Sequence, residues 1–197
     1  MKRAALGFRV HSGWTALVAI SLEHGFPQVL LRQRPHLVPI FTFEFRQPYH
    51  TAEKGPASEA RRFISQARAN ARRLAYQSIH SVQTCLREKD YEINSCGLLL
   101  ASGRPLPALS QILASHALIH TADGELFREA LTHATTRFGF KMFAIKEREL
   151  LDECSIDFQL EHDELLRRVA SLGSALGPPW SQDEKYSALV AWLSLVK

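Results

Sequence analysis

The chain has 197 residues, of which 46% are hydrophobic, and its formal net charge is +4 with histidine neutral. This composition excludes a disordered chain, and the length fits one α/β domain or one domain with a helical appendage. No apolar run approaches the ~20 residues that cross a bilayer, and the three scattered cysteines favour a reducing environment, so we expect a cytoplasmic protein.

Residues 6–22 predict a β-hairpin, because two runs rich in apolar, β-branched and aromatic residues flank a short polar turn. A turn that only reverses the chain needs no guanidinium, imidazole or indole. We therefore consider this turn a candidate functional loop, with an inert decorated loop as the alternative. The residues concerned are Arg9, His11, Ser12 and Trp14.

The next segments are less regular. Residues 28–37 predict a third strand with Arg32, Arg34 and His36 on one face. Residues 39–45 are apolar and aromatic, which indicates a further strand or a packed extended stretch. Residues 46–58 form a loop marked by proline and glycine.

Residues 58–89 predict the longest helix, with Ser58 as its N-cap and apolar residues recurring at helical spacing. Arg61, Arg68 and Arg72 fall close to one line beside the apolar stripe. Such a line is either a solvated basic face or a surface that contacts nucleic-acid phosphates, because arginine forks match phosphate oxygens.

The rest of the chain alternates between strands and helices. A continuously apolar run, residues 94–101, predicts a strand buried on both faces. The segments that follow predict a helix, a second helix, a strand and two further helices, at residues 109–118, 125–138, 141–145, 161–176 and 183–195. We expect residues 1–152 to form an α/β domain and residues 153–197 to form a helical segment packed on it.

This order predicts a three-layer mixed α/β sheet of about five strands. It resembles the ribonuclease-H-like fold. It is also similar to the middle domain of eukaryotic and archaeal peptide-chain release factors, through a basic helix followed by Cys96-Gly-Leu-Leu-Leu-Ala-Ser-Gly103. The resemblance covers roughly residues 4–150.

The chain departs from both patterns at their functional positions. Ribonuclease-H-like nucleases carry an acid on the first strand and another on the strand after the long helix; here the first strand has Arg9 and His11, and the later strand is apolar. Two-metal catalysis needs clustered carboxylates. Release factors place Gly-Gly-Gln before the long helix, where this chain has Lys54-Gly-Pro-Ala-Ser58. The resemblance therefore implies the fold and not these activities.

Ligands of open α/β sheets bind outside the carboxyl ends of strands. This rule selects candidate ligand-binding residues after three strands: Arg9, His11 and Ser12, then Ser102 and Arg104, then Lys146. Cations converging on one rim suit a phosphate or carboxylate. The alternative is that each is a separate surface charge at a strand end.

His116 and His120 share a helix face, with Glu125 further on, and could bind a metal or act as acid and base. Against this, no third ligand is evident, and Asp123-Gly124 suggests a break in the helix. His50 in the proline-marked loop is a weaker candidate of the same kind. We therefore expect capping and hydrogen-bonding histidines, with no metal and no cofactor.

These observations favour a non-enzymatic domain that binds RNA or another phosphate-bearing ligand through the basic helix and the strand-end rim. One alternative is a small hydrolase or phosphoryl-transfer enzyme that uses His11, or His116 with His120. The other is an interaction module in which Trp180, Trp192 and the C-terminal helices form a surface for a protein partner or a second copy of the chain.

Overall fold

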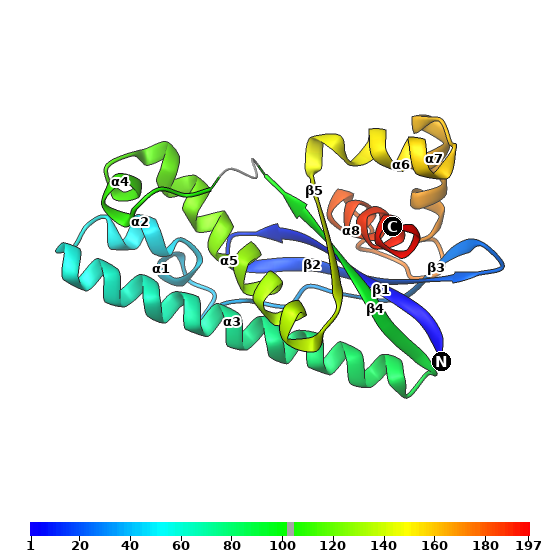
Figure 1. The fold of residues 1–197 in the computed structure, drawn as a ribbon, viewed down its shortest axis with the longest axis horizontal. Coiled ribbons are helices and arrows are strands. Elements are labelled where there is room, and N and C mark those ends of the chain that lie inside the picture. Colours follow the sequence, from blue (N-terminus) through cyan, green and yellow to red (C-terminus); the bar gives the residue numbers. More distant parts are fainter. Residues whose placement is uncertain (102–104) are drawn as a thin grey trace.

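A computed structural model describes residues 1–101 and 105–197, and Figure 1 shows one mixed sheet between layers of helices. The five strands follow the order β3-β2-β1-β4-β5. β1, β2 and β3 pair antiparallel, whereas β4 pairs parallel with both β1 and β5. This arrangement confirms the predicted mixed α/β sheet. The strands are β1 Lys2–His11, β2 Trp14–Glu23, β3 Phe26–Gln33, β4 Tyr91–Leu100 and β5 Lys141–Lys146.

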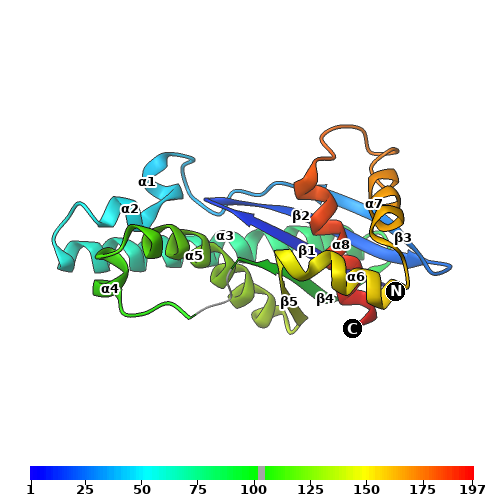
Figure 2. The same cartoon turned by 90° about the horizontal axis from the view of Figure 1, so that it is seen from above.

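Helices α3 and α5 cover one face of the sheet, and α8 lies on the other face with α6 and α7 beside it (Figures 1 and 2). The helices are α1 Phe43–Arg46, α2 Pro48–Ala52, α3 Ala57–Arg87, α4 Leu109–Leu113, α5 His116–Phe138, the 3₁₀ turn η1 Glu147–Glu149, α6 Leu150–Phe158, α7 His162–Ser171 and α8 Gln182–Val196. Within the described residues, no helix is both long and apolar enough to span a membrane.

The structure corrects several boundaries. The stretch expected to be extended or looped contains the short helices α1 and α2, and α6 was not expected. The N-cap position of α3 is Pro56, so Ser58 lies within the first turn and does not cap the helix. Helix α5 runs through Asp123-Gly124 without a break. The Asp123 carboxylate accepts a hydrogen bond from the Tyr49 backbone N–H, so it does not compete for the backbone of α5.

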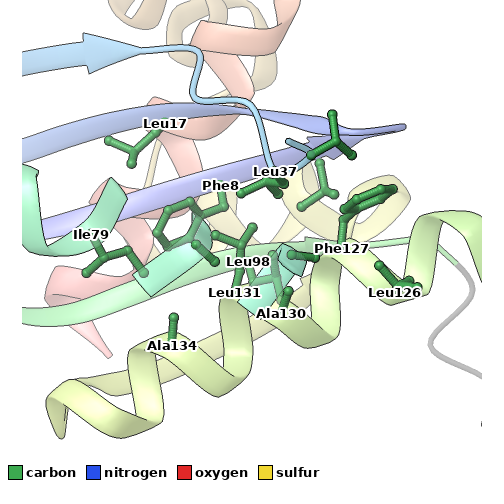
Figure 3. Packing of buried hydrophobic residues seen from close by; sticks show 14 of the residues in the cluster. Phe8, Leu17, Leu37, Ile79, Leu98, Leu126, Phe127, Ala130, Leu131 and Ala134 are labelled. Carbon is green, nitrogen blue, oxygen red and sulfur yellow. The ribbon is translucent and has the colours of Figure 1, made fainter. Parts of the chain in front are cut away.

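The side chains of β1 alternate between two hydrophobic cores, one on each face of the sheet. Alternate residues from Ala4 to Val10 pack under α3 and α5, where Figure 3 shows Phe8 close to Ile79 and Leu98. The intervening residues face α8: Ala5 belongs to the α8 core, and Gly7 lies against the Ser187 carbonyl. Arg9 and His11 continue on the α8 face, since side chains two apart on a strand share a face.

Helix α8 approaches the sheet backbone closely. A Cβ on Gly7 would overlap the Ser187 carbonyl, and one on Gly97 would overlap the Val190 carbonyl. Two serine hydroxyls, one on the helix and one on β4, form hydrogen bonds across this interface. Ser187 Oγ of α8 donates to the Ala16 carbonyl at 3.1 Å, and Ser95 Oγ of β4 donates to the Ser194 carbonyl at 2.9 Å. The sheet therefore requires glycine at these crossings.

The C-terminal tryptophans do not form the surface expected of an interaction module. Trp192 is buried and stacks on Phe158 with ring centroids 3.9 Å apart. Trp180 is half-buried against Gly173, and its indole N–H donates to the Val169 carbonyl at 2.9 Å. The partner-surface interpretation is wrong for Trp192, because a helix on the sheet buries its aromatic residues inward.

We expect Gly7→Ala to destabilise the protein by about 3 kcal/mol, because the new methyl group forces α8 away from β1. Urea unfolding monitored by circular dichroism measures the change. Gly55→Ala is the matched control, since a Cβ there meets only ordinary van der Waals contacts, and it should change the unfolding free energy by less than about 0.5 kcal/mol. Equal effects of the two substitutions would contradict the close-approach argument.

Candidate functional site

The carboxyl end of β1 holds a cluster of alternating charges, which we call the strand-end cluster. β1 supplies Arg9 and the imidazole of His11, and the segment after β3 supplies Arg34. The carboxylates come from η1, directly after β5, and from the first turn of α8. The members are Arg9, His11, Arg34, Glu147, Asp183 and Glu184.

Arg9 is the centre of this cluster. Its Nε and Nη2 donate to the two carboxylate oxygens of Glu147 at 3.0 and 2.6 Å, and its Nη1 donates to Asp183. The guanidinium also lies over the Tyr186 ring, 5.5 Å from its centroid. Hydrogen bonds to Glu147, and then to Asp183, raise the pKa of Arg9 despite its burial. Its charge is therefore already compensated by two carboxylates.

His11 shares Asp183 with Arg9. Its Nε2 lies 2.7 Å from Asp183 Oδ1, and its ring stacks on Trp14 with centroids 4.3 Å apart. The guanidinium of Arg34 lies on the same indole, 5.0 Å from the ring. The Asp183 carboxylate thus orients the His11 imidazole. A carboxylate–imidazole pair can transfer protons in catalysis, and the same contact also holds the His11 side chain in place.

Arg34 holds the other acidic residue of α8. Its Nε donates to Glu184 Oε1 at 2.6 Å, and the Ser181 hydroxyl and backbone N–H donate to Glu184 Oε2 at 2.7 and 2.9 Å in a capping box. Burial raises the pKa of Glu184, but the hydrogen bonds from Arg34 and Ser181 outweigh it and lower the pKa to about 2.

The cluster does not fit the two-metal centre of ribonuclease-H-like nucleases. Two divalent ions need several free carboxylate oxygens, whereas here the Arg9 fork occupies both oxygens of Glu147 and one of Asp183. The end of β4, which would supply a further acid, reads Leu98-Leu-Leu100. The Arg9 guanidinium therefore occupies the carboxylate oxygens that metal ions would need.

The structure brings together part of the predicted strand-end rim. Arg9 and His11 meet at Asp183, while Lys146 Nζ pairs with Glu149 at 3.0 Å and the Ser12 carbonyl accepts a hydrogen bond from Arg46. Ser102 and Arg104 lie outside the described residues. That the rim binds an anion stays a prediction.

Sequence reasoning missed the three long-range partners of this cluster. Arg34, Asp183 and Glu184 are far from β1 in sequence, and only the fold brings them to Arg9 and His11. Ser181-Gln-Asp-Glu184 is a capping-box pattern that could have located the start of α8. No local pattern could have paired it with β1.

The predicted arginines of α3 form a second basic surface beside three hollows along this helix, which we together call the α3–α5 groove; α4 bounds the first hollow and α5 bounds the other two. Arg72 Nε donates to Glu129 Oε1 of α5 at 3.0 Å, and Arg68 lies 3.6 Å from the same carboxylate. Arg61 is exposed and lines a hollow beside α4 together with Arg68.

Further along the groove, Arg72 and Arg73 line a second hollow of about 380 Å³ with Tyr76, His133 and Arg137. The Arg137 guanidinium lies 4.9 Å from the Tyr76 ring.

A third group of polar residues joins α2 to the start of α5. One ring nitrogen from each of His50, His116 and His120 lies within 4.8 Å of the other two, so the fold places beside the α5 pair a third imidazole that was not evident in the sequence. His50 Nδ1 lies 2.5 Å from Asp123 Oδ2, and burial raises the pKa of Asp123. Glu125 is not part of this group; it pairs with Arg128 at 3.1 Å.

The strand order and the helices on its two faces define an α/β protein of the ribonuclease-H-like fold. Among solved structures, the chain is similar to Thermus thermophilus RuvC in complex with a Holliday junction substrate, with a TM-score of 0.53 and 9% identity over 98% of this chain and 93% of that chain. A Thermus thermophilus RuvC structure gives the same TM-score and coverage at 10% identity.

No protein-family model and no curated protein matches the sequence. At such low identity the RuvC likeness shows the fold alone, and the resemblance to release factors stays a prediction.

We expect Arg9→Met to destabilise the protein by about 2–4 kcal/mol, because it leaves Glu147 and Asp183 facing each other without their shared cation. Urea unfolding at neutral pH measures the loss. Arg148→Met, at an arginine with 77% side-chain exposure, is the control and should change the unfolding free energy by less than about 0.5 kcal/mol. A neutral Arg9→Met would mean that the cluster contributes nothing to the fold.

The Arg34–Glu184 pair predicts an acid-labile contribution to stability. Because the folded-state pKa of Glu184 lies below its ordinary value of 4.5, the contribution is complete above pH 4.5 and is lost as the pH falls towards 2. We expect Glu184→Gln to cost about 3 kcal/mol at pH 6 and much less at pH 3. Urea unfolding across this range, with the exposed Glu161→Gln as control, tests it; a cost independent of pH would refute the assignment.

Proposed function

We propose that this chain binds RNA or another phosphate-bearing polymer along the groove between α3 and α5, without the two-metal chemistry of ribonuclease-H-like nucleases. One observation carries the proposal. Four arginines of α3 line two hollows: two of them face the α4 segment, and the other two lie beside Tyr76 of α3 and a histidine and an arginine of α5. The four are Arg61, Arg68, Arg72 and Arg73.

The spacing of these four arginines along α3 suits a polyanion. Arg61 and Arg73 are twelve residues apart, which is about 18 Å along a helix and roughly the length of five phosphates in one strand of a duplex. Within the described part of the chain, neither Arg61 nor Arg73 takes part in an ion pair. Arg68 and Arg72 share the part-buried carboxylate of Glu129, but their side chains are 45% and 38% exposed, so phosphate oxygens can contact the same guanidinium groups.

Aromatic groups in the groove favour a nucleic acid over a simple anion. Tyr76 stacks on Phe138 with centroids 4.6 Å apart, and Arg137 lies against its ring. Rings beside arginines give bases a stacking surface, while the guanidinium groups contact the backbone. The strand-end cluster offers a polyanion less, because Arg9 is 17% exposed and both Arg9 and Arg34 are paired with carboxylates. Arg61 and Arg73 are exposed.

RuvC, which has the same fold, is a neighbour solved with a Holliday junction substrate. This supports nucleic acid as the ligand class for the present chain. The departure at Arg9 argues against carrying over hydrolysis by bound metal ions.

The test is fluorescence anisotropy with a labelled single-stranded RNA, and a DNA of the same sequence, between 50 and 200 mM salt. We expect the affinity to fall steeply with salt. The double variant Arg61→Ala/Arg68→Ala should weaken binding. It should also reduce the slope of log affinity against log salt concentration by about 1.4 in magnitude, because each lost phosphate contact contributes about 0.7 in single strands.

The control removes the same charge from another face. Arg148→Ala/Arg167→Ala changes two arginines of η1 and α7 whose side chains are 77% and 76% exposed. This variant should keep the slope of the unmodified protein. Equal slopes for both double variants, or binding that does not respond to salt, would overturn the proposal.

A further inference from the structure

We propose that His50, His116 and His120 form a binding site for one zinc ion, with Asp123 as the residue that orients His50. Helix α2 supplies the first imidazole, and the first two turns of α5 supply the other two at a spacing of four residues. The site is separate from the α3–α5 groove and from the strand-end cluster.

The distances match a tetrahedral ion after small side-chain movements. His116 Nε2 and His120 Nε2 lie 3.0 Å apart, and one ring nitrogen of each of the three histidines falls within 4.8 Å of the others. Two nitrogens bound at 2.0–2.1 Å to a tetrahedral zinc lie about 3.3 Å apart. The two exposed imidazoles of α5 have room to adjust, while His50 is held in place.

Asp123 supplies the support that metal-binding histidines require. Its carboxylate is 4% exposed, accepts the Tyr49 backbone N–H at 2.7 Å through Oδ1, and contacts His50 Nδ1 at 2.5 Å through Oδ2. In the proposed site the His50 Nδ1–H donates to this carboxylate, and Nε2 is then the atom that binds the ion. Carboxylate–histidine pairs of this kind fix the tautomer and raise the basicity of the ligand.

The donor set selects the class of metal. Three imidazoles suit zinc and its transition-metal neighbours, whereas Mg²⁺ and Ca²⁺ prefer oxygen ligands. With three protein ligands a tetrahedral ion keeps its fourth position for water or an anion. Bound there, the ion would tie α2, and with it the connection between β3 and α3, to α5.

The test uses untagged protein, so that no added histidines compete. Isothermal titration with zinc should give one site per chain, and zinc at about 100 times its Kd should raise the melting temperature by roughly 5–10 °C. Nitrogen-15 correlation spectra should show three of the nine imidazoles shifting on zinc addition. Magnesium at millimolar concentration should produce neither change.

Variants separate this site from chelation by an exposed histidine pair. His50→Ala, His116→Ala and His120→Ala should each weaken zinc binding at least about 100-fold, and Asp123→Asn about 10–100-fold with the stoichiometry kept. His80→Ala, at an exposed histidine of α3, is the control and should bind like the unmodified protein.

Unchanged affinity in His50→Ala, or only two shifting imidazoles, would mean that the α5 pair binds zinc alone and would overturn the proposal. The imidazole spectra need no substitution, so they decide the question even where a variant fails to fold.

Discussion

The close contact between α8 and the sheet determines how the rest of the strand-end region is built. At Gly7 and Gly97 the helix backbone rests on the strand backbone with no side chain between them. Serines on both elements then bond across the interface, so the helix has one position along the strands. As a consequence the first turn of α8 reaches the carboxyl end of β1, where Asp183 meets Arg9.

Arg9, at the carboxyl end of β1, determines the electrostatics of the strand-end cluster. Glu147 and Asp183 lie close enough together to share one cation, and the cation they share is the guanidinium of Arg9. The same two carboxylates around a small aliphatic residue would attract an ion from solution. Here the cation is covalently attached to β1, which stabilises the fold and leaves little electrostatic attraction for either a metal or a phosphate.

Local patterns predicted the elements with the strongest periodicity. Alternation in β1 and β2 and the apolar run of β4 located the strands, and the helical spacing of α3 located its arginines, because each pattern reflects burial on a defined face. The short helices α1 and α2 were not predicted, because a helix of four or five residues is too short to show a periodic pattern of apolar residues. The pairing of Arg9 with Asp183 was not predicted, because 174 residues separate them in the sequence and only the packing of α8 on the sheet brings them together.

Helix α2 connects the two proposed ligand sites that lie outside the strand-end region. Tyr49 is among the residues that line the hollow with Arg61 and Arg68, and its backbone N–H donates to the carboxylate of Asp123. His50, the next residue, contacts that same carboxylate. A five-residue helix has little stability of its own, so its position depends on these contacts. An ion held by the histidines would therefore also fix the Tyr49 wall of the arginine-lined hollow, and ordering of α2 at one site would favour binding at the other.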